Sequence, residues 1–274
     1  MDFAASAPYD RIDMHPEDPM EKLDAIFFSP HKFLGGPGSS GVLVFNSSLY
    51  HNKSPDQAGG GTVNWTNPWG EYKFIDDIEI REDGGTPGFL QAIRTAMAME
   101  VKEQMGVNNI HNRENELLAV AFHEMQKVSG LHILADNIRD RLGVISFYMD
   151  SIHYNLIVSL LSDRFGVQVR GGCACAGTYG HYLLDVSYEK SKRISEKISH
   201  GDLSEKPGWV RLSLHPTMTR NEVVYIADAL RQISQNHKLW LTDYNYNPHT
   251  NEFQSKISIK ENKKAEAWIS LNVL

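Results

Sequence analysis

One short segment constrains the fold of this chain more than any other. Ser29-Pro30-His31-Lys32 directly follows the apolar run Ala25–Phe28, and seven residues rich in glycine and serine, Gly35–Gly41, come soon after. A short apolar run bounded by such residues is typical of a buried strand. A lysine at the end of a buried strand is unfavourable unless its charge is paired or neutralised. Lys32 therefore either lies at an exposed strand end or is placed there for chemistry.

The composition excludes two classes of partner. The 274 residues carry 27 basic and 34 acidic side chains, for a formal net charge of −7. This balance suits a soluble protein and argues against a nucleic-acid partner. No apolar stretch reaches the length of a membrane span, and the first six residues lack the basic region of an export signal. We expect neither a nucleic-acid nor a membrane partner.

The two cysteines, Cys173 and Cys175, are separated by one residue. On an extended strand, residues two apart point to the same face but are too far apart for an easy disulfide. We therefore expect two free thiols in a reducing cytoplasm. Two thiols at this spacing, without nearby histidine or cysteine partners, also lack a zinc-binding pattern, and we expect no metal site.

The order of apolar and polar residues predicts two regions. In the first, two short strands lie at 24–29 and 42–45, a long loop covers 47–87, and an amphipathic helix covers 88–105. A second helix, at about 112–128, leads into an α+β region. That region has strands predicted at 132–135, 143–150, 167–170 and 209–214, helices at 151–165 and after the capping box Thr219–Glu222, and a solvated helix or loop at 188–200. The residues after Trp240 are polar and suggest no function.

Four polar residues can share one crevice beside the first strand. Ligands bind open α/β sheets at the carboxyl ends of their strands, where Asp2, Ser29, His31 and Lys32 would lie. A lysine and a carboxylate at adjacent strand ends suit pyridoxal phosphate, because the amine forms a Schiff base and the carboxylate keeps the pyridine nitrogen protonated. The other reading is a frayed terminus, a solvated lysine and a hairpin loop, and these residues alone leave both open.

A series of motifs in a fixed order resembles the class V aminotransferase family, and within it the cysteine desulfurase and selenocysteine lyase branch. The motifs are Asp2-Phe3-Ala4-Ala5, Ser29-Pro30-His31-Lys32, Gly35–Gly41, Gly59-Gly60-Gly61-Thr62, Glu82–Pro87, Arg170–Ala176 and Val210-Arg211-Leu212-Ser213. They extend from residue 2 to about residue 235. Each glycine motif alone is weak, but the ordered set is specific.

The resemblance implies a role for each polar residue of the first crevice. Lys32 would form the Schiff base with pyridoxal phosphate, Asp2 would pair with the pyridine nitrogen, and Ser29 and His31 would bind the phosphate. Thr86 would reach the phosphate of a neighbouring subunit, which implies a homodimer with shared active sites.

The resemblance also implies roles for three residues of the second region. Arg211 would bind the carboxylate of a small amino-acid substrate as a bidentate pair. Cys175 matches the nucleophile that takes sulfur from cysteine, leaving alanine and a persulfide that a sulfur acceptor protein could receive. Arg170 would assist at the cysteine loop. The alternative for both thiols is that they are small side chains packed on a strand.

Several departures from the family pattern keep other activities open. Cys173 and Ala174 stand where histidine often precedes the nucleophile, and Ala5 replaces a glutamine. A related aminotransferase or another amino-acid lyase is the alternative.

The resemblance also begins inside the family's large domain. We therefore expect an α/β chain equivalent to the C-terminal part of a pyridoxal-phosphate-dependent transferase. It would consist of an incomplete large domain at 1–105, an α+β small domain at 106–240 and an extension at 241–274. Such a piece would expose apolar sheet surface and could be inactive without the missing part.

Overall fold

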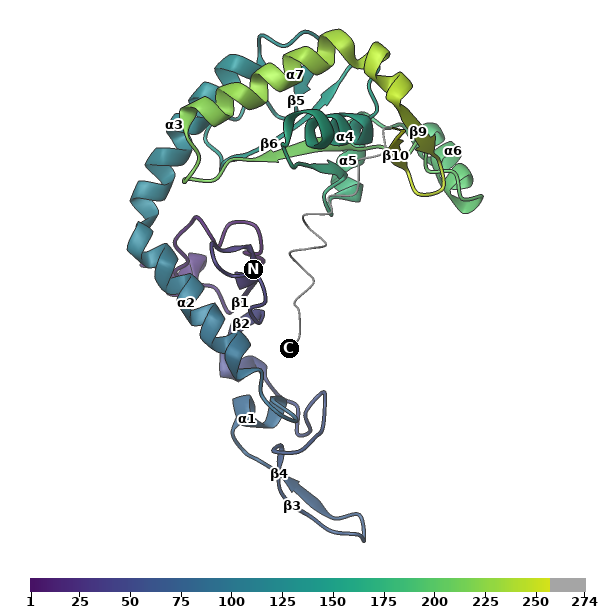
Figure 1. Cartoon of the computed structure of the whole chain (residues 1–274). Helices are drawn as coiled ribbons and strands as arrows, with labels where there is room; N and C mark the ends of the chain where they lie inside the picture. Colours follow the sequence, from purple (N-terminus) through teal and green to yellow (C-terminus); the bar gives the residue numbers. More distant parts are fainter. Residues whose placement is uncertain (257–274) are drawn as a thin grey trace, which may run out of the picture. The chain divides into compact units, whose positions relative to one another are not determined.

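The computed structural model describes residues 1–256, which divide into two units between Asn112 and Arg113. The division falls within helix α3 (Val107–Met125) (Figure 1). The predicted division at 105 and 240 stays a prediction, and most of the predicted extension lies outside the described residues. Each unit is treated separately below.

The first unit is built around a small sheet. Strand β1 (Ala25–Phe28) pairs antiparallel with β2 (Val42–Phe45), as the sequence predicts. Asp2 forms a parallel bridge with Phe27, so the first residues of the chain extend this sheet on its other edge. Because side chains alternate along a strand, Ile26 and Phe28 are buried, whereas Phe27 is 47% exposed. Leu43 and Val44 of β2 are exposed as well. These side chains confirm the prediction that the sheet exposes apolar surface.

Helix α2 (Phe89–Met105) packs against this sheet through Ala98 and confirms the predicted helix. It ends at Gly106, whose φ of +76° suits glycine at a helix C-terminus. Five large apolar side chains of α2 stay exposed: Phe89, Leu90, Ile93, Met97 and Met99.

The stretch 47–87 is not a simple loop, so that prediction was wrong. It contains a short 3-10 helix (Ser47–Leu49), the hairpin β3 (Val63–Thr66) and β4 (Tyr72–Phe74), and helix α1 (Ile78–Glu82). Asn67 shapes the hairpin turn, because its side-chain oxygen accepts hydrogen bonds from the backbone N–H groups of Trp69 and Glu71. Two further 3-10 helices, Pro19–Glu21 and Pro30–Lys32, flank β1.

The second unit contains a four-stranded antiparallel sheet in the order β5-β6-β8-β7. The strands are β5 (Leu131–Ile133), β6 (Val144–Met149), β7 (Arg170–Gly172) and β8 (Trp209–Ser213). Strand β7 shares only Arg170 with the predicted strand at 167–170. The reason is that Gly166 ends the preceding helix in the left-handed conformation and the N–H of Val167 still donates to Leu161.

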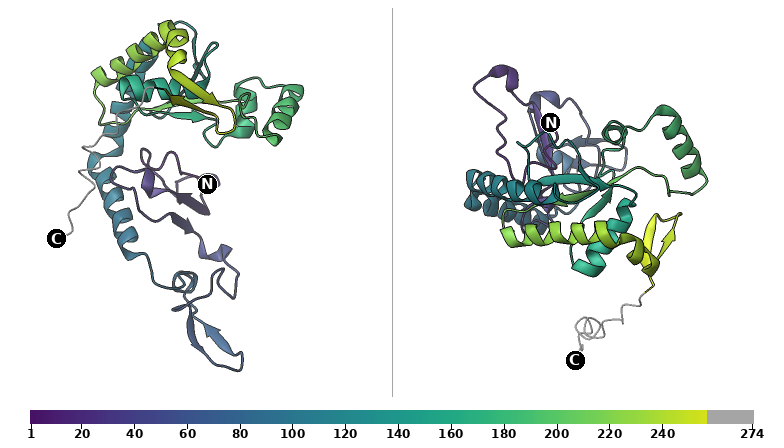
Figure 2. Two further views of the ribbon diagram at one scale, coloured as in Figure 1. Left: turned by 45° about the vertical axis from the view of Figure 1, so that its right-hand side comes forward. Right: turned by 90° about the horizontal axis from the view of Figure 1, so that it is seen from above.

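Three helices pack on this sheet around one core: α3, α4 (Tyr154–Phe165) and α7 (Arg220–Trp240). Helices α3 and α7 lie side by side (Figure 2) and are joined by Arg231 and Glu124, whose charged atoms are 3.8 Å apart. The Thr219–Glu222 capping box at the start of α7 is confirmed. Its two reciprocal hydrogen bonds satisfy backbone groups at the helix start.

The remaining elements of the second unit are short. Helix α5 (Gly177–Leu183) follows the cysteines, and the charged segment forms helix α6 (Tyr188–Ser199). After a 3-10 turn at Leu241–Asp243, strands β9 (Tyr244–Asn247) and β10 (Glu252–Ser255) form a hairpin that the sequence reading missed. Asn155 of α4 donates a hydrogen bond to the carbonyl of Asn251, which joins this hairpin to the core helix.

Candidate active site

The lysine segment forms an exposed turn at the end of β1. Ser29 precedes the short helix Pro30–Lys32, and its hydroxyl makes no capping hydrogen bond. His31 and Lys32 are both exposed, and within residues 1–256 the structure shows no hydrogen bond or ion pair for the Lys32 amine. The next residue, Phe33, is buried, and its ring stacks on the ring of Phe28 with 5.9 Å between the ring centres. Lys32 is therefore held on a fixed backbone with its amine available.

Gly36 explains the first part of the glycine motif. A Cβ atom at this position would lie 1.9 Å from the carbonyl oxygen of Pro30, so the backbone of the loop packs directly on the lysine turn. Gly41, by contrast, has no atom within 4 Å of such a Cβ. The close approach at Gly36 ties the glycine loop to the position of Lys32.

Asp2 lies on the neighbouring edge of the same sheet. Its parallel bridge to Phe27 places it two residues before the level of Ser29. One carboxylate oxygen accepts a 2.7 Å hydrogen bond from the N–H of Ala4, and the side chain is exposed. The sequence prediction that Asp2 and the Lys32 turn lie at adjacent strand ends is consistent with this pairing.

Thr86 lies in an exposed turn that is joined to the glycine motif at 59–62. The N–H of Gly85 donates to the carbonyl of Gly60, which joins the two glycine motifs within the first unit.

Arg81, a buried residue that the sequence reading missed, donates to the carbonyls of Ile75 and Asn52. Its guanidinium lies 5.3 Å from the centre of the Tyr50 ring, whose hydroxyl donates to Glu82. That hydrogen bond raises the pKa of Tyr50.

The cysteine segment is a tight turn and not an extended strand, which would have placed both thiols on one face. The N–H of Ala176 donates to the carbonyl of Cys173 at 2.8 Å, and Ala174 and Cys175 have φ values of +48° and +67°. Two central residues with positive φ define a turn of type I′. Because neither residue is glycine, this backbone is strained, and such strain is common at functional sites.

The two thiols of this turn have different surroundings. The Cys175 sulfur is exposed and accepts a 3.2 Å hydrogen bond from Nη2 of Arg170. The Cys173 thiol is half-buried and donates to the carbonyl of Pro207 at 2.9 Å. Burial raises the pKa of the Cys173 thiol, which therefore stays protonated. Both cysteines are free, as predicted.

Arg170 and Arg211 lie directly opposite each other on β7 and β8. Residues paired in this way have side chains on the same face of the sheet. Arg170 contacts Cys175, whereas Nε of Arg211 is buried and has no hydrogen-bond partner in the described residues. Two like charges at a paired position are unfavourable without an anion, so this face is suited to bind one.

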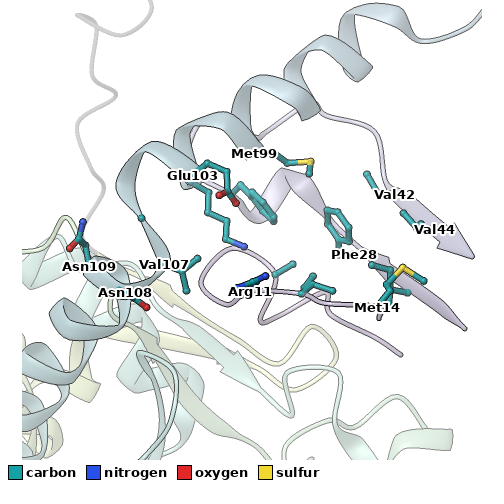
Figure 3. Close-up of a pocket in the computed structure, with 16 residues that line it drawn as sticks. Arg11, Met14, Phe28, Val42, Val44, Met99, Glu103, Val107, Asn108 and Asn109 are labelled. Atoms are coloured by element: carbon teal, nitrogen blue, oxygen red, sulfur yellow. The ribbon is translucent and has the colours of Figure 1, made fainter. Parts of the chain in front are cut away.

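A separate pocket of about 950 Å³ lies in the first unit, between the β1–β2 sheet and α2 (Figure 3). Its walls are mainly apolar and include Phe28, Val42 and Met99, with Arg11 and Glu103 also in the lining. Lys102 also lines it, and burial lowers the pKa of its amine. Neither Lys32 nor Asp2 lines this pocket, so its size does not mark the candidate site.

The structure thus groups the predicted site residues in two sets. Asp2, Ser29, His31, Lys32 and Thr86 belong to the first unit, and Arg170, Cys175 and Arg211 belong to the second. Among residues 1–256 no cluster of three metal-binding side chains is present. In the same part of the chain, no helix is long and apolar enough to cross a bilayer.

Curated relatives at moderate identity include probable cysteine desulfurases of two Staphylococcus species. A probable cysteine desulfurase of Staphylococcus epidermidis is 35% identical over 176 residues, which cover 64% of this chain and 41% of that protein. A probable cysteine desulfurase of Staphylococcus aureus is 32% identical over 178 residues, with the same coverage of both chains. The chain therefore spans about two fifths of the length of these relatives.

Solved structures have the same fold. The apo cysteine desulfurase from Thermococcus onnurineus superposes with a TM-score of 0.65 at 23% identity, over 86% of this chain and 52% of that one. A cysteine desulfurase from Escherichia coli gives a TM-score of 0.63 at 21% identity, over 85% and 51%. These likenesses confirm the predicted fold, an α/β chain that corresponds to part of the cysteine desulfurase fold.

The family model of the class V aminotransferases matches residues 1–226, which include every candidate site residue in both units. The sequence resemblance is thereby confirmed, and the chain belongs to the class V aminotransferase family.

Proposed function

We propose that this chain carries the sulfur-accepting and cofactor-binding residues of a pyridoxal-phosphate-dependent cysteine desulfurase. The observation that carries the proposal is the Cys175 turn, in which an exposed sulfur at the tip accepts a hydrogen bond from Arg170. A guanidinium donor stabilises negative charge on a sulfur, which is the charge of the attacking nucleophile. The relatives at 35% and 32% identity are both probable cysteine desulfurases.

The residues of the first unit fit pyridoxal phosphate by their donor set. An available amine at Lys32, a carboxylate at Asp2, and hydroxyl and imidazole groups at Ser29 and His31 follow one sheet edge and its turn. When bound, the cofactor withdraws electrons from the substrate's α-carbon. Lys32 would hold its aldehyde, and Asp2 would keep the ring nitrogen protonated. Ser29 and His31 would donate to its phosphate, as would Thr86 of a second subunit.

The residues of the second unit would act on the substrate. Arg211 presents an unpartnered guanidinium nitrogen on the face that also carries Arg170, and a guanidinium binds a carboxylate through two parallel hydrogen bonds. Arg211 would thus orient a small amino acid. Cys175 would attack the sulfur of L-cysteine, take it as a persulfide and leave alanine.

A turnover assay with L-cysteine and pyridoxal phosphate tests this function. Alanine and sulfide should form together in the presence of a thiol reductant, and Cys175→Ser should abolish both while leaving the absorbance of the bound cofactor unchanged. Normal turnover in Cys175→Ser would show a lyase that does not use this thiol, and preferential transfer of the amino group to a keto acid would establish the aminotransferase alternative. If cofactor binds but no variant or wild-type sample turns over, the chain needs a further polypeptide to act.

We also propose the assembly and compartment that this chemistry requires. The exposed apolar side chains of α2 and the neighbouring Thr86 turn support a homodimer with shared sites. Two free thiols support a reducing cytoplasm, and an exposed Cys175 supports delivery to a sulfur acceptor protein. Sedimentation at micromolar concentration with cofactor bound tests the dimer, and a monomer under those conditions would exclude the shared site.

A further inference from the structure

The second thiol, Cys173, has a defined place in the fold that the proposed function does not use. Its sulfur donates to the carbonyl of Pro207 at 2.9 Å and faces Gly180 of α5, where an added Cβ would lie 3.6 Å from it. Cys173 therefore lies between the segment that enters β8 and the helix that follows the cysteine turn.

The two segments beside Cys173, Pro207-Gly208 and the helix α5 around Gly180, are themselves tightly packed. A Cβ atom on Gly208 would lie 2.9 Å from the Cα of Gly172 and 2.7 Å from the Tyr154 ring. A Cβ atom on Gly180 would lie 3.1 Å from the ring of Trp209, which is 3% exposed. The carbonyl of Pro207 is thus presented from a fixed backbone, so the thiol that donates to it is fixed as well.

Cys173 is also the first residue of the turn that carries Cys175. The turn has positive φ at its two central residues, neither of them glycine, and such a backbone persists only when its surroundings impose it. The backbone hydrogen bond from Ala176 to Cys173 closes the turn, and the S–H···O bond to Pro207 holds its first residue to the sheet.

We propose that Cys173 is a positioning residue whose thiol, by donating to Pro207, holds the turn that presents Cys175 to Arg170. The inference rests on Cys175 being the reactive thiol of the proposed function. It differs from a sulfur relay, which needs the Cys173 sulfur itself, and from simple packing, which needs only its volume. Because burial keeps Cys173 protonated, the thiol acts as a donor and not as a nucleophile.

Three substitutions at Cys173 separate the hydrogen-bond donor from simple packing. Cys173→Ser keeps a donor of similar size, Cys173→Ala removes both donor and volume, and Cys173→Val fills the site without a donor. The readout is the rate at which iodoacetamide alkylates Cys175 at neutral pH, followed by mass spectrometry of the Cys175 peptide. Cys175→Ser supplies the background. This rate reports the reactivity of one thiol and needs neither cofactor nor turnover, so it can succeed or fail independently of the proposed function.

We expect Cys173→Ala to slow alkylation of Cys175 about three- to tenfold, the range that one net hydrogen bond provides. Cys173→Ser should stay within about twofold of the wild type. Arg170→Ala should slow the reaction similarly, and adding Cys173→Ala to it should cause little further loss, because both changes break the same contact.

We expect Cys173→Val to be as slow as Cys173→Ala, because neither side chain can donate to Pro207. A wild-type rate in Cys173→Val with a slow Cys173→Ala would mean that Cys173 only packs, and wild-type rates in every variant would mean that the thiol does not hold the turn. Either result would overturn the inference. If Cys173→Ala melts below the assay temperature, Cys173→Val alone decides.

Discussion

At the scale of single residues, Gly171 in strand β7 shows how closely this part of the sheet is packed. A Cβ atom on Gly171 would lie 2.5 Å from Oδ1 of Asn155 and 3.0 Å from Cγ2 of Val158. The Asn155 side chain is already held by its hydrogen bond to Asn251. Strand β7 can therefore approach α4 only because position 171 lacks a side chain.

Gly171→Ala should lower the free energy of unfolding of the second unit by about 1–3 kcal/mol, the usual effect of overpacking. The matched control is Gly177→Ala at the start of α5, where no atom lies within 4 Å and φ is not positive. The control should be neutral or slightly stabilising. Urea-induced unfolding measures both, and equal stabilities for the two variants would contradict the packing argument.

Tyr244 joins the β9–β10 hairpin to α4, and its contribution to the stability of the fold depends on pH. Its hydroxyl donates to Asp163 at 2.9 Å, and burial together with this bond raises the pKa of Tyr244 well above its ordinary value. The folded state therefore keeps the proton at pH values where the unfolded state, with a tyrosine pKa of about 10, has lost it. The stability that the hydroxyl contributes is complete below pH 10 and declines as the pH rises further.

Tyr244→Phe should lower the free energy of unfolding by about 0.5–1.5 kcal/mol at pH 8, the range for one net hydrogen bond. The difference from the wild type should be constant from pH 8 to about pH 9 and shrink as the pH rises above about 10. Urea titrations at these pH values measure it. A difference that is constant or grows over this whole range would show that the hydroxyl is not held as described.

At the scale of elements, the start of α7 is the clearest case of local sequence determining structure. The hydroxyl of Thr219 accepts from the N–H of Glu222, and the Glu222 carboxylate accepts from the N–H of Thr219. The bond from the Thr219 N–H to the carboxylate, together with one from the Thr219 hydroxyl to the same carboxylate, lowers the pKa of Glu222. The pattern is local, so the sequence alone predicts it.

Thr219→Ala should destabilise the second unit by about 1 kcal/mol, because the N–H of Glu222 loses its acceptor and the Glu222 carboxylate loses the Thr219 hydroxyl. Thr219→Ser keeps the hydroxyl and should recover most of that loss. Thermal unfolding of the three proteins distinguishes the cap from any other role of Thr219. Identical melting of the Ala and Ser variants would argue against the capping account.

Elements were predictable where their signal was local or periodic and were missed where it was not. The strands 25–28 and 42–45 and helices α2 and α7 follow from apolar runs and spacing. The two missed hairpins, β3–β4 and β9–β10, are short and mostly polar, but each has alternating aromatic residues around an asparagine-containing turn, a signal that could have been used.

The candidate site also has features that the sequence predicts and features that only the structure shows. Lys32, Asp2 and Cys175 could be named from the sequence, because a family motif fixes residue identity. The type I′ turn at Cys173–Ala176 could not, because alanine and cysteine rarely adopt positive φ and only the packing around them imposes it. Arg81 was missed for a similar reason, since its partners are backbone carbonyls distant in the sequence.

At the scale of the whole molecule, the residues of the proposed reaction come from two units. Lys32 and Asp2, the proposed cofactor ligands, belong to the first, and Cys175 and Arg211, proposed to act on the substrate, belong to the second. The family match spans both units, and the chain covers 41% of the length of the Staphylococcus relatives. The central claim is that Lys32 holds the cofactor, because every other role in the proposed reaction depends on it.

The most direct measurement of that claim traps pyridoxal phosphate on the 274-residue chain with borohydride and locates the modified lysine by peptide mass spectrometry. The account predicts that Lys32 carries most of the adduct. Lys32→Ala should lose both the adduct and the absorbance of the bound cofactor, whereas Lys22→Ala, an exposed lysine before β1, should keep them. An adduct centred on another lysine, or an unchanged spectrum in Lys32→Ala, would contradict the account.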